Sequence, residues 1–324
     1  MVTGGAGFIG SHLVEALLAR GLEVRCLVRD PANPKWLAGL DVELVRGDID
    51  EPESLKRIFG GVDYVFHAAG ITKTADPADY YRVNAEGTKN LALAAIEGDN
   101  GGRLQKFVLV SSQAAAGPSR EGTPRREDDP PAPVTDYGKS KLMGEKYAIE
   151  LKDKLPLVIV RPPSIYGPRD KDVYTFFKLV SHGIRTTFRE KRLISMCYVG
   201  DLVDGILSAA FRKTVSGEVF FIADPTPYGW DDMGEAIAVA LGTRATRVVV
   251  PVPVLSVVAA VSEAVAALTG RPALLNRQKM AEIRQRYWVL DVEKAKEMLG
   301  FVAAHDFKTG ARLTVEWYRR QGWI

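Results

Sequence analysis

The chain has 324 residues, a formal net charge of +3 and a hydrophobic fraction of 46%. These values are typical of a globular protein with one large domain or two smaller ones, and the small net charge gives no argument for nucleic acid binding. Two cysteines, Cys26 and Cys197, are too few to predict a disulfide framework or a metal cluster. We therefore expect a reducing, cytoplasmic location.

A glycine-rich turn lies at residues 3–10. The apolar Val2 precedes it, and helical apolar spacing follows it, so the turn stands between a predicted strand and a predicted helix. Gly4 permits a tight turn, Gly7 lets the backbone approach a pyrophosphate, and Gly10 lets the helix pack closely on a sheet. The segment therefore predicts a phosphate cradle at a helix N-terminus.

Short apolar strands then alternate with helical stretches. The predicted strands cover residues 23–28, 42–48, 62–70, 107–112 and 157–162. This alternation predicts right-handed crossovers and an α/β fold with a doubly wound parallel sheet. We expect residues 1–168 to form a dinucleotide-binding domain and residues 169–324 a smaller substrate-binding cap. Residues 195–223 are expected to return to the first domain, because residues 219–222 have the pattern of a buried strand.

Two later segments have no strand pattern. Residues 117–135 are polar and rich in proline, which predicts a surface loop beside the site or a plain linker. Residues 251–268 form the most apolar stretch. Glu263 and two prolines in it favour a buried or pocket-lining helix over a membrane span, with contact to a membrane surface as the alternative.

Tyr137 and Lys141 are four residues apart in a predicted helix and therefore share one of its faces. An ammonium beside a phenol favours the phenolate, so we expect Lys141 to lower the pKa of Tyr137 and to make it an acid/base group. Either this pair or the glycine turn alone is a weak signal. Their order and separation in one chain favour a dinucleotide-dependent enzyme.

Further motifs follow in a fixed order along the chain. They are Gly47-Asp48-Ile49, His67-Ala68-Ala69-Gly70, Val83-Asn84-Ala85-Glu86-Gly87-Thr88, Ser111-Ser112, Arg161-Pro162-Pro163-Ser164-Ile165-Tyr166-Gly167-Pro168 and Tyr198-Val199-Gly200-Asp201-Leu202. With the two features above, they resemble the extended short-chain dehydrogenase/reductases over nearly the whole chain. The closest resemblance is to dihydroflavonol reductases and 3β-hydroxysteroid dehydrogenases. It implies a Rossmann fold that carries a C-terminal cap.

The resemblance also implies catalytic roles. Tyr137 exchanges a proton with the substrate oxygen, and Lys141 holds the nicotinamide ribose. Ser112, with Ser111 as its competitor, hydrogen-bonds the same oxygen at the end of a strand, where open α/β sheets bind ligands. Asn84 has two interpretations, an ordered water chain to Lys141 or a structural hydrogen bond. No residue is assigned to a metal.

The cofactor residues implied by the resemblance belong to these same motifs. They are Gly4, Gly7, Phe8, Ile9, Gly10, Arg29, Asp48, Ile49, Ala68, Ala69, Gly70, Tyr137, Lys141 and Pro162. NAD-selective relatives place an acid where this chain has Val28. Arg29 follows it and suits a 2′-phosphate, so NADP is favoured, while Asp30 keeps NAD open.

The substrate class is predicted from two positions at which this chain differs from the nucleotide-sugar enzymes of the family. Nucleotide-sugar enzymes of the family commonly carry an Asn and an Arg where this chain has Ser164 and Ile194. Unless Arg189, Lys191 or Arg192 compensates, a sugar diphosphate would lack a counter-charge.

We therefore predict an NAD(P)-dependent oxidoreductase that interconverts a secondary alcohol and a ketone on a bulky apolar small molecule. The alternatives are a nucleotide-sugar epimerase or dehydratase with tightly bound NAD, and a non-catalytic dinucleotide-binding protein. A homodimer is compatible with either.

Overall fold

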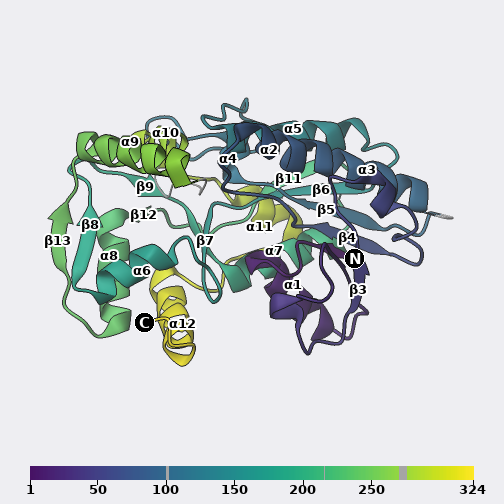
Figure 1. The fold of residues 1–324 in the computed structure, drawn as a ribbon, viewed down its shortest axis with the longest axis horizontal. Coiled ribbons are helices and arrows are strands. Elements are labelled where there is room, and N and C mark those ends of the chain that lie inside the picture. Colours follow the sequence, from purple (N-terminus) through teal and green to yellow (C-terminus); the bar gives the residue numbers. More distant parts are fainter. Residues whose placement is uncertain (100–101, 215, 270–275) are drawn as a thin grey trace.

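The structure is a computed structural model that describes residues 1–99, 102–214, 216–269 and 276–324. It has a large sheet with helices on both faces and a smaller part beside it (Figure 1). The N-terminal residue lies at the large sheet, and the C-terminal helix lies in the smaller part.

Seven strands form the large sheet, and every neighbouring pair is parallel. They are β1 (Val2–Thr3), β2 (Arg25–Val28), β3 (Glu43–Arg46), β4 (Tyr64–His67), β5 (Lys106–Val110), β6 (Leu157–Arg161) and β11 (Glu218–Phe221). Their spatial order is β11-β6-β5-β4-β1-β2-β3. β2 and β3 are added on one side of β1 and the later strands on the other, so the strand order switches between β1 and β4. The prediction of a doubly wound parallel sheet is confirmed.

The central strands β5 and β6 bury both of their faces, which explains their continuous apolar runs. In β5, Val108 and Val110 join one hydrophobic core, while Phe107 and Leu109 join the other. The first core lies under α1 (Phe8–Leu18), α7 (Val199–Phe211) and α11 (Glu293–Leu299). The second lies under η2 (Pro52–Leu55), α3 (Gly87–Gly98) and α5 (Asp136–Glu150). Short helices complete the connections: η1 (Lys35–Leu37), α2 (Pro77–Tyr80), η3 (Tyr81–Glu86) and α4 (Gln113–Ala116).

The smaller part packs three helices around an aromatic core. They are α6 (Tyr174–Ser181), α8 (Trp230–Leu241) and α12 (Phe307–Arg320). Asp306 caps α12 by accepting a hydrogen bond from the Thr309 amide, and two arginines in its last turn suit the helix dipole. Short strands connect these helices: β7 (Ser164–Tyr166), β8 (Ile184–Thr187), β9 (Leu193–Ile194), β10 (Met196–Tyr198), β12 (Tyr228–Gly229), β13 (Thr246–Val249) and β14 (Tyr287–Trp288).

The chain crosses between the two parts more than once. After β10, which pairs with β7, α7 packs on the large sheet and β11 adds its edge strand beside β6. The segment 117–135 is also partly buried. Arg125 in it lies inside the protein, and its amide donates to the Val289 carbonyl.

The apolar stretch near residue 260 forms α9 (Val252–Thr269), which packs against α10 (Arg277–Arg284). The expectation of a buried helix is wrong, because most described side chains of α9 are exposed, whereas its alternative, a pocket-lining helix, stays a prediction. The cap core is already filled by α6, α8 and α12 and includes none of the α9 side chains that the structure describes. No helix in the described part of the chain has the length and apolarity that crossing a membrane requires.

Candidate active site

The glycine turn connects β1 to α1, and two of its glycines have no substitute. Gly4 has a φ of +70°, and a Cβ there would lie 2.7 Å from the Ala68 carbonyl carbon. A Cβ on Gly10 would lie 2.2 Å from the Gly4 carbonyl oxygen, so any side chain would force the helix off the turn. The first turn of α1 carries neither a capping side chain nor an acid. Its amide groups therefore suit the pyrophosphate of a dinucleotide.

Three further loops leave the same end of the sheet. Arg29 is exposed directly after β2, and it has no hydrogen bond or ion pair to any residue that the structure describes. After β3, an Asp48 carboxylate oxygen accepts from the Asp50 amide at 3.1 Å, and Ile49 is buried beside Gly87. Residues 68–70 follow β4. The structure thus places the predicted cofactor residues around the carboxyl ends of neighbouring strands.

Asn84 joins the loop after β4 to α5. Its Oδ1 accepts from the Ile71 amide at 2.9 Å, and its Nδ2 donates to the Ile71 carbonyl at 3.0 Å and to Ser140 Oγ at 3.1 Å. A Cβ on Gly70 would lie 2.9 Å from Asn84 Oδ1 and 3.9 Å from Lys141 Nζ. These contacts correspond to the structural interpretation of Asn84.

Ser112, Tyr137 and Lys141 meet where β5 ends. Thr135 starts α5 by accepting from the Gly138 amide, which places Tyr137 in the first turn of the helix. The Ser112 hydroxyl lies near enough to the Tyr137 phenol to influence its pKa, and it accepts from the Ala114 amide at 3.1 Å. Lys141 Nζ donates to the Val110 carbonyl at 2.8 Å. Ser111 differs, because its Oγ is buried with no hydrogen-bond partner among the described residues.

The electrostatics correct one expectation. Withdrawal from water raises the pKa of Tyr137 to about 12, although the nearby Ser112 hydroxyl opposes the rise. The same desolvation lowers the pKa of Lys141 to about 8, against the attraction of Glu145. We expected Lys141 to lower the pKa of the phenol. In this structure burial dominates, and the ammonium is directed to a carbonyl instead.

A buried ion pair lies one helical turn beyond Lys141. Glu145 accepts two hydrogen bonds from Arg161, at 2.9 and 2.6 Å, and both side chains are almost fully buried. Arg161 ends β6 directly before Pro162. The pair therefore fixes α5, which carries Tyr137 and Lys141, to the strand that leads into Pro162. The sequence analysis missed it, although Tyr137, Lys141 and Glu145 recur at intervals of four on one helix face.

The rim of the site combines both parts of the protein. The Tyr80 ring packs edge-on against Tyr137, with 6.0 Å between centroids. On α10, Gln278 Oε1 accepts from the Asp136 amide at 2.7 Å, and its Nε2 donates to the Asp136 carboxylate. Glu282 of the same helix lies near enough to raise the pKa of Tyr137 further. The cap is therefore attached directly to the first turn of α5.

Arg192 is the candidate cation closest in sequence to Ile194, where nucleotide-sugar enzymes commonly carry an arginine, and its guanidinium is already hydrogen-bonded within the protein. Arg192 is buried, donates to the Ile283 and Gln285 carbonyls, and stacks on the Phe188 ring at 4.6 Å. Ser164 and Ile194 lie in the short strands β7 and β9. Arg189 and Lys191 are exposed.

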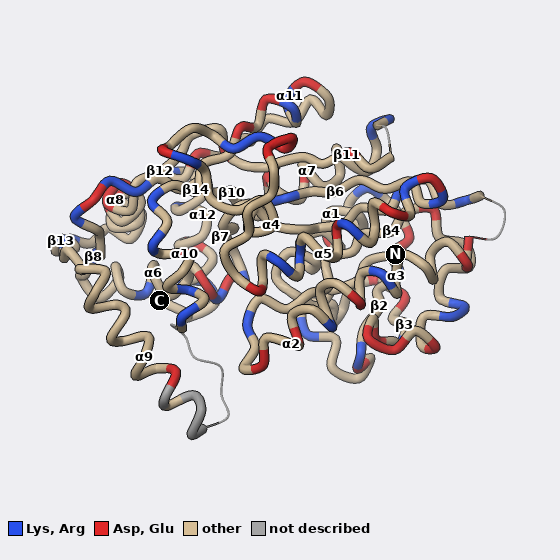
Figure 2. The backbone as a smooth tube through the Cα atoms, turned by 90° about the horizontal axis from the view of Figure 1, so that it is seen from above, with Lys and Arg blue, Asp and Glu red and all other residues tan. Residues whose placement is uncertain are grey.

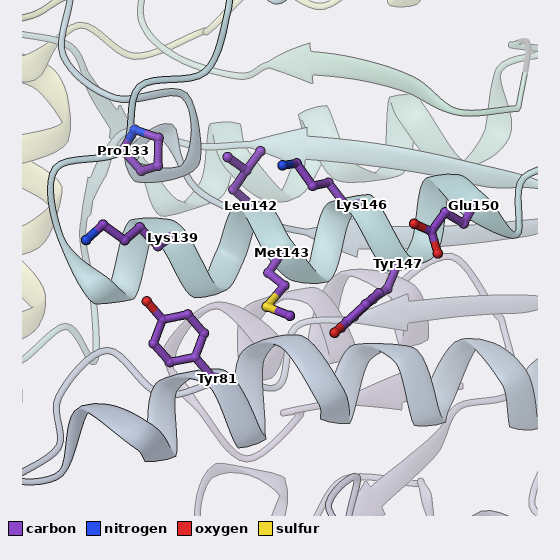
Figure 3. Close-up of a pocket in the computed structure, with 8 residues that line it drawn as sticks. All are labelled: Tyr81, Pro133, Lys139, Leu142, Met143, Lys146, Tyr147 and Glu150. Carbon is purple, nitrogen blue, oxygen red and sulfur yellow. The ribbon is translucent and has the colours of Figure 1, made fainter.

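A surface hollow lies on another face of α5 (Figure 3). Its volume is about 440 Å³, and neither Tyr137 nor Lys141 lines it. The lining residues are Tyr81, Pro133, Lys139, Leu142, Met143, Lys146, Tyr147 and Glu150. The hollow is therefore separate from the candidate catalytic group.

Residues 1–223 match the model of the NAD-dependent epimerase/dehydratase family. The chain belongs to this family. The epimerase/dehydratase family comprises NAD-dependent oxidoreductases and epimerases of the extended short-chain dehydrogenase/reductase type, so the protein is an enzyme of that type and the predicted resemblance is confirmed.

Relatives within the family act on different substrates. A protein named ceramide reductase, from Caulobacter vibrioides, is 31% identical, and the match covers 100% of this chain and 95% of that protein. The 3-beta-hydroxysteroid dehydrogenase of Mycolicibacterium neoaurum is 30% identical over 75% of this chain and 70% of its own. A solved UDP-glucose 4-epimerase of Thermotoga maritima, with UDP-glucose, has a TM-score of 0.81 and 25% identity, and covers 99% of this chain and 98% of its own.

Proposed function

We propose that the protein is an NADP-dependent oxidoreductase that interconverts a secondary alcohol and a ketone on a bulky apolar substrate. The observation that carries the chemistry is the convergence of Ser112, Tyr137 and Lys141 where β5 ends, near the glycine turn. A phenol and a hydroxyl held together in this way suit an oxygen that gains or loses a proton as hydride moves.

The proposed mechanism assigns one task to each side chain. A bound nicotinamide would supply or accept the hydride. In the reducing direction, Tyr137 gives its hydroxyl proton to the carbonyl oxygen as the carbonyl carbon gains the hydride, and Ser112 donates a hydrogen bond to that oxygen. Lys141, protonated below its lowered pKa of about 8, holds the ribose hydroxyls and stabilises the tyrosinate that forms. Pro162 and residues 68–70 complete the cofactor-binding loops.

The engaged Arg192 supports the choice of an apolar substrate. A sugar diphosphate carries two negative charges, and the guanidinium nearest to the expected position is committed to backbone carbonyls. The reductase of ceramide, a lipid, is similar to this chain over the whole of its length, and the steroid dehydrogenase is similar over most of it. Exposed Arg29, which has no hydrogen bond or ion pair to a described residue although its charge reaches Asp50, supports NADP.

A nucleotide-sugar epimerase with tightly bound NAD is the second candidate, and the likeness to the solved UDP-glucose 4-epimerase favours it. Epimerases recycle their cofactor, whereas a reductase releases it. Absorbance and mass spectrometry of the purified protein distinguish them: dinucleotide retained at one equivalent through gel filtration supports the epimerase.

Substitution of Tyr137 by Phe tests the catalytic proposal. Loss of a positioned acid/base group costs at least about a hundredfold in rate. The measurement is oxidation of reduced nicotinamide with a panel of hydrophobic ketones. Tyr147→Phe is the matched control, because Tyr147 lies in the same helix but bonds Glu86 outside the site. A Tyr137→Phe enzyme with turnover close to that of Tyr147→Phe would remove Tyr137 from its role.

We also propose a cytoplasmic location and leave the homodimer as a proposal. Both cysteines are buried and free, which supports a reducing compartment. Sedimentation velocity at several protein concentrations tests the oligomeric state.

A further inference from the structure

The helix α9 has a covered side and an apolar side that stays open. Leu255, Ala259 and Ser262 recur at helical spacing on the covered side, where Ala259 is 2% exposed. On the outer side, Val254 is 51% exposed, Val257 65%, Val258 49% and Val261 59%. We call these four valines the α9 stripe. Their spacing of i, i+3, i+4 and i+7 makes them one continuous apolar face.

The position of α9 leaves this face open to a large partner. Figure 2 shows the helix extending from one edge of the molecule, away from the large sheet. The preceding strand β13 adds Val248 and Val249, which are also exposed. Contiguous exposed apolar surface of this kind is uncommon on soluble proteins unless something binds it.

The charge around the stripe indicates what that partner is. Residues 244–286 contain seven arginines and lysines and two glutamates, a net charge of +5, although the whole chain has only +3. The rest of the chain is therefore net negative. Among the described cations of this segment, Arg247, Arg277, Lys279 and Arg286 pair with carboxylates, whereas Arg244 and Arg284 are exposed and have no ion pair to a described residue. An apolar helix face flanked by cations is the pattern of a helix that lies in the interface of an anionic membrane.

The stripe is also connected to the candidate catalytic group. Arg277 at the start of α10 pairs with Glu263 of α9 at 3.2 Å. One residue further, Gln278 holds both the amide and the carboxylate of Asp136, which precedes Tyr137. One helix therefore separates the stripe from the catalytic tyrosine, so a surface that met the stripe would lie on the cap side of the site.

We propose that the α9 stripe docks the enzyme on an anionic lipid surface. The four valines enter the boundary between headgroups and acyl chains, and Arg244 and Arg284 face the phosphates. Docking would bring the rim formed by α10 to the bilayer, from which an apolar substrate can pass without crossing water. That delivery rests on the proposed function, whereas the docking does not.

Co-sedimentation with vesicles tests the docking with the full chain and without substrate. One set of vesicles contains phosphatidylcholine and phosphatidylglycerol, the other phosphatidylcholine alone. We expect the wild type to sediment with the anionic set, and less so as salt is raised. Val257→Ser/Val261→Ser should lower the partition coefficient by about tenfold or more, because it removes apolar groups from the interface. Val302→Ser is the control, since Val302 is 64% exposed but far along the chain from the stripe.

A charge-reversal variant gives an independent measurement. Arg244→Glu/Arg284→Glu should lose about tenfold or more for anionic vesicles and little for neutral ones. Melting temperature and cofactor affinity, unchanged in each variant, show that the fold is kept. A wild type that leaves vesicles unbound, or a serine double variant that binds as well as the wild type, overturns the proposal. So does self-association that the serine variant abolishes while vesicles capture no protein, because the stripe would then cover a second copy. Vesicle binding without ketone reduction would refute the proposed function and support the docking.

Discussion

Among single residues, Arg29 carries the choice between the two nicotinamide cofactors. A charge-assisted contact to a 2′-phosphate contributes about 1.5–3 kcal/mol. Arg29→Ala should therefore weaken NADP binding by about ten- to a hundredfold and leave NAD nearly unchanged. Calorimetric titration with both cofactors measures this, with Arg57→Ala as an exposed-arginine control. Equal losses for the two cofactors would show that Arg29 stacks on adenine or faces solvent.

Lys141 predicts a pH dependence whose sign follows from its lowered pKa. The group keeps its proton below about pH 8 and loses it as the pH rises through that value. Because the ammonium is the form that holds the ribose hydroxyls, kcat/KM for reduction should fall above about pH 8. Tyr137 does not cause this fall, since its pKa lies near 12. A profile that stays flat to about pH 10 would contradict the assignment.

The identities of the candidate residues could be predicted from the sequence, but their ionisation could not. Ser112, Tyr137 and Lys141 belong to motifs with fixed spacing, and the structure brings the three together. The direction of the Tyr137 pKa depends on how far the surrounding atoms exclude water, which no spacing encodes. Glu145 was missed for another reason: its partner Arg161 follows it by sixteen residues, in a different element.

At the level of elements, the ion pair between α5 and β6 is a test of how the site is held. Arg161→Met or Glu145→Gln alone leaves a buried charge unpaired, which typically lowers the free energy of unfolding by about 3–5 kcal/mol. The double variant Glu145→Gln/Arg161→Met should recover much of this loss, because neither charge remains. Urea denaturation of the four proteins completes the cycle.

Cofactor binding by the same variants separates a role of the ion pair in positioning Lys141 from its role in stability. If the pair also positions Lys141, the stable double variant should still bind the cofactor more weakly than the wild type. Additive stability losses in the cycle would contradict a coupled pair.

Element types were predicted well, and their burial was predicted less well. The five strands of the first half are found because each combines an apolar run with flanking turn residues. For α9, the sequence shows valines and alanines on every side of the helix, and such a pattern is the same for a buried helix as for one with an open face. Only the position of α6, α8 and α12 decides which side is covered.

For the whole molecule, the path of the chain makes the sheet depend on residues beyond the predicted first domain. A fragment of residues 1–168 lacks β11 and α7. It would expose the edge of β6 and the apolar face that α7 covers. We expect this fragment to aggregate when the full chain is soluble, as measured by gel filtration of both. A soluble 1–168 fragment that unfolds cooperatively would show that the domain boundary is a true folding boundary.

The hydrogen bond from the Asp136 amide to Gln278 links α5 to α10 through one backbone hydrogen. The Asp136 amide belongs by sequence to the helix that begins beside Tyr137, but its acceptor is the Gln278 side chain of α10. Solvent deuterium can replace this hydrogen only when that bond breaks. The exchange rate of a single proton at the mouth of the site thus reports how firmly the cap side chain holds α5.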